Sequence, residues 1–183
     1  MALSTNIAAA TLGAMLFAGP AISQTSAVSS RPAVAAATIS SSDYVRQTAM
    51  SDLFEIQSSQ MALDKSQDAA VRKFAQQMIH DHTQSSEKLK KLLQTENVNI
   101  APPSKLDQAH LALLDKLRGA SGSAFDKDYV KDQIAGHREA LAVQKTYAAS
   151  GEDAKLKSFA QAAADMVQMH LDEAEKLGQG GST

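Results

Sequence analysis

The 183-residue sequence contains no cysteine, no tryptophan and only four prolines. Without cysteine, the chain cannot form disulfides, bind metals through thiolates, attach a c-type haem or use a cysteine nucleophile. It also has neither a phosphate-binding glycine-rich loop nor a Gly-x-Ser-x-Gly elbow. We recognise no catalytic motif and predict no cofactor-binding motif, so the sequence does not indicate whether the protein is an enzyme.

The sequence also has no large excess of charge of either sign. Its 18 basic and 20 acidic residues give a net charge of -2 and are spread along the chain. Because proteins that bind nucleic acids concentrate Lys and Arg on one face, we expect no nucleic acid partner. Strong helix formers dominate, and no segment alternates polar and apolar residues as a strand does. These features predict an all-α domain.

The amino-terminal segment, positions 1–23, has features of an export signal. A short apolar run covers residues 7–18, and Ala21 and Ser23 place small residues at the positions that a signal peptidase reads. The segment before the run lacks Lys and Arg, and a membrane anchor is the alternative. However, the run is too short to span a bilayer comfortably. We therefore predict cleavage near Ser23, a periplasmic or secreted protein, and no stable membrane insertion after cleavage.

The rest of the chain divides into a linker, one helical domain and a tail. Residues 24–42 are rich in Ser, Ala and Thr and predict a flexible linker, whereas residues 43–178 form the domain and 179–183 a disordered tail. We expect Asp43 to cap the first helix. Hydrophobic spacing and helix breakers predict long helices over residues 43–64, 69–94, 125–149 and 152–177, and a short helix over 104–118.

The domain contains an internal repeat. A single shift along the chain aligns Tyr44-Val45 with Tyr129-Val130, and Phe74-Ala75-Gln76 with Phe159-Ala160-Gln161, without a gap. The repeat predicts two related helical hairpins. The segment between them carries the short helix, which at about 20 Å is long enough to return along much of a bundle. We therefore predict a ferritin-like four-helix bundle of two repeated hairpins joined by a crossover containing a short helix.

Each long helix carries a polar residue where its apolar stripe should be hydrophobic. At alternating spacings of three and four residues, the stripes include Asp52, His82, His137 and His170 in successive long helices. Counting from the turn of each hairpin puts Asp52 level with His82, and His137 within about 4.5 Å of the height of His170. We predict that these four side chains meet inside the bundle, with Glu55 one turn from Asp52.

Buried polar groups without partners cost roughly 1–3 kcal/mol each. The cluster must therefore bind a ligand, trap water or satisfy itself. The first hypothesis is a metal site in which the three histidines donate nitrogen, and Asp52 or Glu55 donates oxygen or orients a histidine. Such ligands suit a divalent transition metal, namely zinc, iron, manganese or copper. The alternative is a non-catalytic structural or interaction bundle whose histidines form a pH-sensitive hydrogen-bond network.

Three segments resemble a known family, because each places a histidine at a characteristic distance from an aromatic residue. They are Val71–His82 (VRKFAQQMIHDH), Phe125–His137 (FDKDYVKDQIAGH) and Leu156–His170 (LKSFAQAAADMVQMH). Together with Glu55 at an acidic position, they resemble exported bacterial proteins in the domain of unknown function family 4142. The resemblance covers residues 43–177. It implies a ferritin-like fold and an exported location, but no established reaction.

The sequence departs from ferritins at the positions that bind iron. Di-iron bundles carry Glu-x-x-His on two helices. Here Ile79 and Val167 stand three residues before His82 and His170, and neither side chain can ligate a metal. Iron storage and di-iron oxidation are therefore not expected. A stress-related role is a hypothesis for the exported metal-binding protein, and the sequence indicates neither a protein partner nor an oligomeric state.

Overall fold

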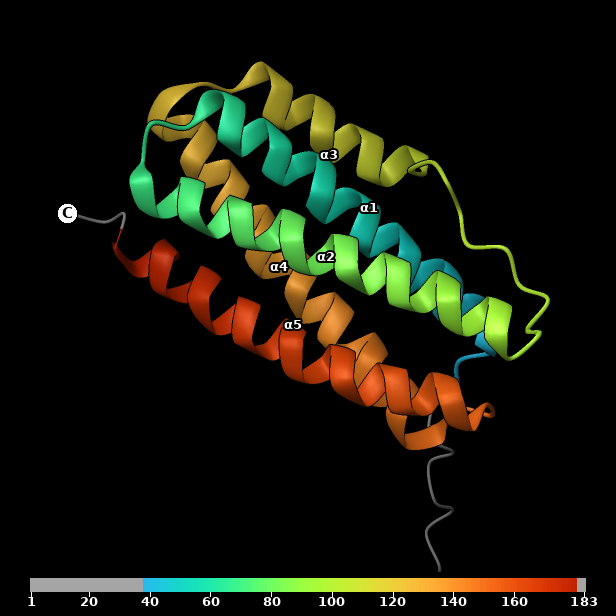
Figure 1. Cartoon of the computed structure of the whole chain (residues 1–183). Helices are drawn as coiled ribbons and strands as arrows, with labels where there is room; N and C mark the ends of the chain where they lie inside the picture. The colour runs from blue at the N-terminus through green and yellow to red at the C-terminus, as the bar shows by residue number, and fades with distance from the viewer. Residues whose placement is uncertain (1–37, 181–183) are drawn as a thin grey trace, which may run out of the picture. The chain divides into compact units, whose positions relative to one another are not determined.

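The structure is a computed structural model that describes residues 38–180 (Figure 1). This part of the chain consists of helices and connecting segments, and it contains no strand. The predicted signal peptide and most of the predicted linker lie outside the described residues, as do residues 181–183. In chain order the helices are α1 Ser41–Lys65, α2 Ala69–Thr95, α3 Gln108–Gly119, α4 Gly122–Ser150 and α5 Ala154–Gly180.

The four long helices lie side by side as a bundle (Figure 1). Helices α1 and α2 form one antiparallel hairpin, and α4 and α5 form a second. Helix α3 lies outside the bundle against α1, where Leu114 packs on Met50 and Phe54. It runs back toward the α1–α2 turn, where α4 begins. The predicted bundle of two hairpins joined by a crossover containing a short helix is confirmed.

Side-chain caps explain where the helices begin. The Asp68 carboxylate accepts hydrogen bonds from the backbone N–H groups of Ala70 and Val71, at 2.8 and 3.0 Å. Helix α1 is capped by Ser40, whose hydroxyl accepts from the backbone N–H of Asp43 at 3.1 Å. The prediction that Asp43 caps this helix was wrong, since Asp43 lies in its first turn and α1 begins within the predicted linker.

Capping residues also explain why other helices begin at positions different from those predicted. Helix α3 begins at Gln108, later than predicted, because Asp107 accepts a hydrogen bond from the N–H of His110 at 3.0 Å and caps the helix there. Helix α5 begins at Ala154, where Asp153 accepts from the N–H of Leu156 at 2.8 Å. It continues to Gly180, so the helix includes the start of the predicted tail.

We expect Asp68→Ala to lower the free energy of unfolding by about 1 kcal/mol, because two N–H groups in the first turn of α2 lose their acceptor. Urea denaturation measures this change. Asp64→Ala is a matched control, since Asp64 is exposed near the end of α1 and caps no helix. Equal losses in the two variants would contradict a capping role for Asp68.

The apolar core is divided by a polar middle layer. Phe74 and Tyr129 belong to a cluster nearer the α1–α2 turn, whereas Leu89 and Tyr147 belong to a cluster toward the other end of the bundle. On α2 the buried positions between Met78 and Leu89 are polar. Aromatic and aliphatic layers therefore enclose the histidine-containing layer from both ends, which places any site there deep in the bundle.

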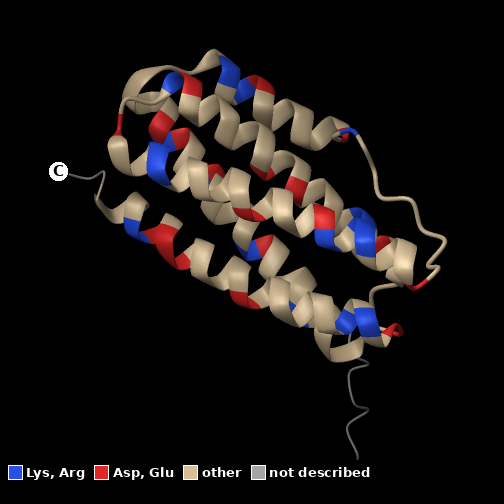
Figure 2. Cartoon of the chain, viewed as in Figure 1, with Lys and Arg blue, Asp and Glu red and all other residues tan. Residues whose placement is uncertain are grey.

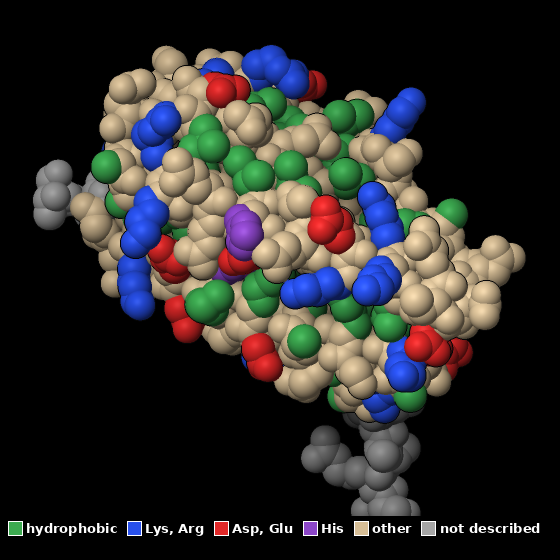
Figure 3. All heavy atoms as spheres, viewed as in Figure 1, with side chains coloured by type: hydrophobic (Ala, Val, Ile, Leu, Met, Phe, Trp, Pro, Cys, Tyr) green, Lys and Arg blue, Asp and Glu red, His purple; other side chains and the backbone are tan. Residues whose placement is uncertain are grey.

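The surface carries a mixture of charges. Figure 2 shows Lys and Arg interspersed with Asp and Glu along the helices in this view. The same face, drawn in full in Figure 3, has small hydrophobic patches between polar side chains. Within residues 38–180, none of the helices has the length and apolar character needed to cross a membrane. The expectation that the protein does not bind nucleic acid remains a prediction.

Candidate metal centre

Each of the four long helices contributes a polar side chain to the middle of the bundle. His82 on α2, His137 on α4 and His170 on α5 are at most 2% exposed, and Asp52 on α1 is 3% exposed. Each lies on the buried face of its helix, and burial of the apolar residues on that face turns the polar residue inward. The predicted meeting of these four side chains in the interior is confirmed.

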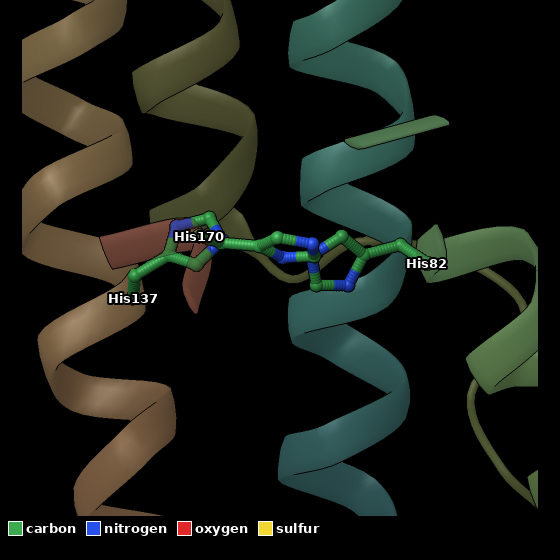
Figure 4. Close-up of side chains that lie close together, drawn as sticks. All are labelled: His82, His137 and His170. Carbon is green, nitrogen blue, oxygen red and sulfur yellow. The ribbon is translucent and has the colours of Figure 1, made fainter. Parts of the chain in front are cut away.

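The three imidazole rings project toward one another, as Figure 4 shows. Their centroids are 5.4, 5.5 and 5.6 Å apart in the three pairs. One nitrogen from each ring lies within 4.8 Å of one nitrogen from each of the others. Three nitrogens about 2.0–2.1 Å from a tetrahedral metal would be roughly 3.4 Å apart. Small inward shifts of the rings would therefore suffice to bind one ion.

One nitrogen of each ring is held by a hydrogen bond to an oxygen of the protein. The pairs are His82 Nδ1 with Asp52 Oδ1 at 2.8 Å, His137 Nδ1 with the Gln133 carbonyl at 2.8 Å, and His170 Nε2 with Asp81 Oδ2 at 2.9 Å. Carboxylate and carbonyl oxygens only accept, so the held nitrogen of each ring donates its proton. These bonds fix the tautomer and orientation of each ring, as the outer partners of metal ligands do.

The second nitrogen of each ring is buried and has no hydrogen-bond partner. These atoms are His82 Nε2, His137 Nε2 and His170 Nδ1. When the held nitrogen carries the only proton, the other presents a lone pair, which is the form that binds a metal. Leaving a buried polar atom unpartnered costs about 1–3 kcal/mol. The residues therefore fit a tris-histidine metal site, in which the ion would supply the missing partner of each ring.

Burial keeps two of the three rings neutral. It lowers the pKa of His137 to about 3 and the pKa of His170 to about 4, and the nearby charge of His82 adds to both shifts. Burial also acts to lower the pKa of His82, but the hydrogen bond and charge of Asp52 outweigh it, so this pKa is raised above its ordinary value. At neutral pH His137 and His170 offer lone pairs, whereas the raised pKa of His82 means that a proton competes with a metal for this ring.

The sequence matches a family described as a domain of unknown function, DUF4142, over residues 25–177. The chain belongs to the DUF4142 family. The resemblance carried by its three histidine-containing segments is thus confirmed. No curated protein matches the sequence significantly.

Solved structures with a similar fold include CopM and two DUF305 proteins. The Cu(II)-bound form of CopM matches with a TM-score of 0.67 and 17% identity, over 79% of this chain and 99% of that chain. A DUF305 fragment from Deinococcus radiodurans matches with a TM-score of 0.65 and 14% identity, over 74% of this chain and 93% of that chain. A DUF305 protein from Streptomyces coelicolor has the same TM-score and identity, over 76% of this chain and 91% of that chain. At these identities the likeness establishes the helical fold alone.

One hydrogen-bonding partner in this DUF4142 centre was not predicted. Asp81 contacts His170 across the α2–α5 interface, although its side chain is 23% exposed. It directly precedes His82 and so lies about 100° from it around α2, outside the narrow stripe on which the prediction rested. Asp81 is three residues after Met78 and four before Ser85, so a wider stripe along α2 would have included it.

Asp52 has no free oxygen directed at the cluster. Its Oδ1 accepts from His82, and its Oδ2 accepts from the hydroxyl of Ser86 at 3.1 Å. Of the two roles predicted for Asp52, this geometry favours orienting His82 over direct ligation.

Glu55, the remaining predicted site residue, lies beside His137 between α1 and α4. Its Oε1 is 3.8 Å from His137 Nδ1, which is too far for a hydrogen bond. Its Oε2 is buried without a partner, and burial raises the pKa of Glu55 to about 7. Glu55 therefore borders the cluster on the side of the held nitrogen of His137.

Proposed function

We propose that this protein binds a transition metal ion through His82, His137 and His170. The observation that carries the proposal is a cluster of three buried histidines in which one nitrogen of each ring lies within 4.8 Å of one nitrogen of each of the others. Each ring also has one buried nitrogen that lacks a hydrogen-bond partner. The opposite nitrogens are already oriented by Asp52, Asp81 and a backbone carbonyl, an arrangement typical of metal-bound histidines. The metal would be held in the enclosed middle layer of the bundle.

Copper is the first metal to test, followed by zinc, iron and manganese. Imidazole suits copper, zinc and iron, and the chain has no cysteine that could supply a thiolate ligand. CopM, which shares the fold, has structures in Cu(II)-bound, Cu(I)-bound and silver-bound forms. A set of three nitrogens leaves a further coordination position for water.

Elemental analysis of the mature protein, purified without an affinity tag, tests the proposal. We expect one equivalent of metal in the wild type and none in His82→Ala or His137→Ala. His80→Ala is the matched control, because His80 is an exposed histidine on the same helix as His82. A folded wild type without metal, or His82→Ala with a full equivalent, would contradict the proposal.

We expect Asp81→Asn to weaken metal binding by about 10- to 100-fold, because the amide keeps the shape but removes the charge that orients His170. Competition with a chelator of known affinity measures this loss. Asp165→Asn is the control, since Asp165 is exposed on α5. If both variants keep wild-type affinity, Asp81 does not support the metal site.

We also propose that the protein is exported and acts outside the cytoplasm. Support comes from the apolar run and small residues within positions 1–23. Mass spectrometry of the protein recovered from the periplasm is expected to show an amino terminus at Gln24. An intact chain beginning at Met1 would contradict cleavage.

The second candidate function is a non-catalytic structural or interaction bundle. The observation that favours it is that each ring already has one hydrogen-bond partner within the protein. In that case the histidines form a polar network that responds to pH, and the exposed helix faces bind a partner protein. A folded, metal-free protein in the elemental analysis would support this candidate instead.

A further inference from the structure

A cavity of about 310 Å³ lies beside the metal centre, lined by residues of α1 and α4 and by the start of α3. Arg46 and Glu139 line it and are exposed, whereas Glu55 and Gln144 line it and are at most 3% exposed. The cavity therefore extends from the surface toward the interior. Glu55 also borders the histidine cluster, since its Oε1 is 3.8 Å from His137 Nδ1.

The charges around this cavity favour a cation. Three acidic side chains line it, those of Glu55, Asp107 and Glu139, together with the basic side chains of Arg46 and His110. Because the pKa of Glu55 is raised to about 7, a cation that binds Glu55 displaces a proton from part of the molecules at neutral pH. Arg46 is itself paired with Asp43 at 3.2 Å. A concave surface with more acidic than basic groups raises the local concentration of cations.

We propose that this cavity is a loading site, where an incoming metal cation binds the carboxylate of Glu55 before it reaches the histidines. The inference rests on the metal-binding function proposed above. Glu55 lines the inner part of the cavity, and its Oε2 is buried without a hydrogen-bond partner, so the side chain has an oxygen that is free to ligate a cation. Its Oε1 is 3.8 Å from His137 Nδ1, so Glu55 adjoins both the cavity and the histidine cluster.

Gly136 on α4 has no side chain, and this leaves space for the carboxylate of Glu55. A Cβ atom at this position would lie 3.3 Å from Glu55 Oε1, which is tighter than ordinary van der Waals contact. Any side chain here would restrict the carboxylate and narrow the inner end of the cavity. A Gly→Ala change within a helix otherwise favours folding. Slower metal binding in Gly136→Ala would therefore reflect restricted access of the metal to Glu55 and not a loss of stability.

A second cavity, of about 180 Å³, is the competing route. It includes Ser86 in its lining, and Ser86 donates to Asp52 near the other side of the cluster. However, it is lined by proline and aliphatic residues together with Lys90, and by no carboxylate. Its charge therefore disfavours a cation.

Stopped-flow absorbance of Cu²⁺ binding to the metal-free protein tests the route. Ser51→Trp places an indole in the first cavity, and Ser104→Trp places one in the second. We expect Ser51→Trp to slow binding at least tenfold without changing the equilibrium affinity, and Ser104→Trp to bind at the wild-type rate. Gly136→Ala is expected to slow binding in the same way, and circular dichroism verifies that each variant is folded.

The outcomes separate the route from the function. Wild-type binding rates in folded Ser51→Trp and Gly136→Ala would overturn the loading site while leaving the metal centre intact. Slow binding in Ser104→Trp alone would assign the route to the second cavity. A wild-type protein that binds no metal in elemental analysis and no Cu²⁺ here would overturn both the metal centre and its loading site.

Discussion

Adding Cu²⁺ to the metal-free protein is expected to raise its free energy of unfolding by about 2.7 kcal/mol when free metal is at 100 times its dissociation constant. The reason is that the three ligands come from α2, α4 and α5 and are brought together only by folding. Urea denaturation with and without metal measures the gain, and a chelator should reverse it.

Two histidine variants distinguish the proposed centre from adventitious binding. His137→Ala removes a buried nitrogen that has no other partner, so we expect the stabilisation by Cu²⁺ to be lost. His80→Ala removes an exposed imidazole on α2 and should keep the full gain. If His137→Ala is stabilised as much as the wild type, the metal binds at another place.

The metal-free protein is expected to lose stability as the pH falls from 6.5 to 4.5. Folding lowers the pKa of His137 from 6.5 to about 3 and the pKa of His170 from 6.5 to about 4. Over this range the unfolded chain binds a proton at each histidine, and the folded protein does not. Each histidine therefore contributes stability that is complete only above pH 6.5 and falls by roughly 1.4 kcal/mol per pH unit below it.

Glu55 opposes this loss, and His82 leaves it unchanged. Folding raises the pKa of Glu55 from 4.5 to about 7, so between these values the folded protein holds a proton that the unfolded chain lacks. This contribution grows by roughly 1.4 kcal/mol for each unit that the pH falls. The pKa of His82 is raised, so His82 is protonated in both states below pH 6.5 and only loses its stabilising contribution at higher pH. The two histidines lower the free energy of unfolding as the pH falls, and the carboxyl group of Glu55 raises it. The net result is a loss of stability equal to that from a single histidine.

Urea denaturation at a series of pH values, with a chelator present, measures this dependence. Removing the opposing carboxyl in Glu55→Gln should steepen the loss to roughly 2.7 kcal/mol per pH unit, whereas His137→Gln should nearly abolish it. Identical slopes in the two variants and the wild type would show that neither group is held in the protonation state described above.

The fold was predictable because helical spacing, helix breakers and an internal repeat all indicated the same bundle. The meeting of Asp52 with His82 was predictable from their positions along the bundle axis. Both residues are equally far along the chain from Gln67, which lies in the turn of their hairpin. Their 2.8 Å hydrogen bond confirms that counting along two antiparallel helices places residues accurately. The histidine positions followed from the same stripes, because each interrupts an apolar face that must be buried.

Other details depended on side-chain conformation and could not be predicted by counting. Which nitrogen of His170 is held depends on its contact with Asp81, a residue outside the narrow apolar stripe of α2. The position of Glu55 depends on close approach of the α4 backbone at Gly136. The caps at Ser40 and Asp107 were missed because each is one of several polar residues near the start of its helix.

The division of the three histidines between the two hairpins has a consequence for how the proposed metal centre would assemble. The first hairpin supplies only His82, whereas His137 and His170 both belong to the second hairpin and follow much later in the chain. The first hairpin alone holds one imidazole of the three. The proposed metal centre would therefore be complete only after the second hairpin has folded and docked on the first, and an occupied centre would mark a fully assembled bundle.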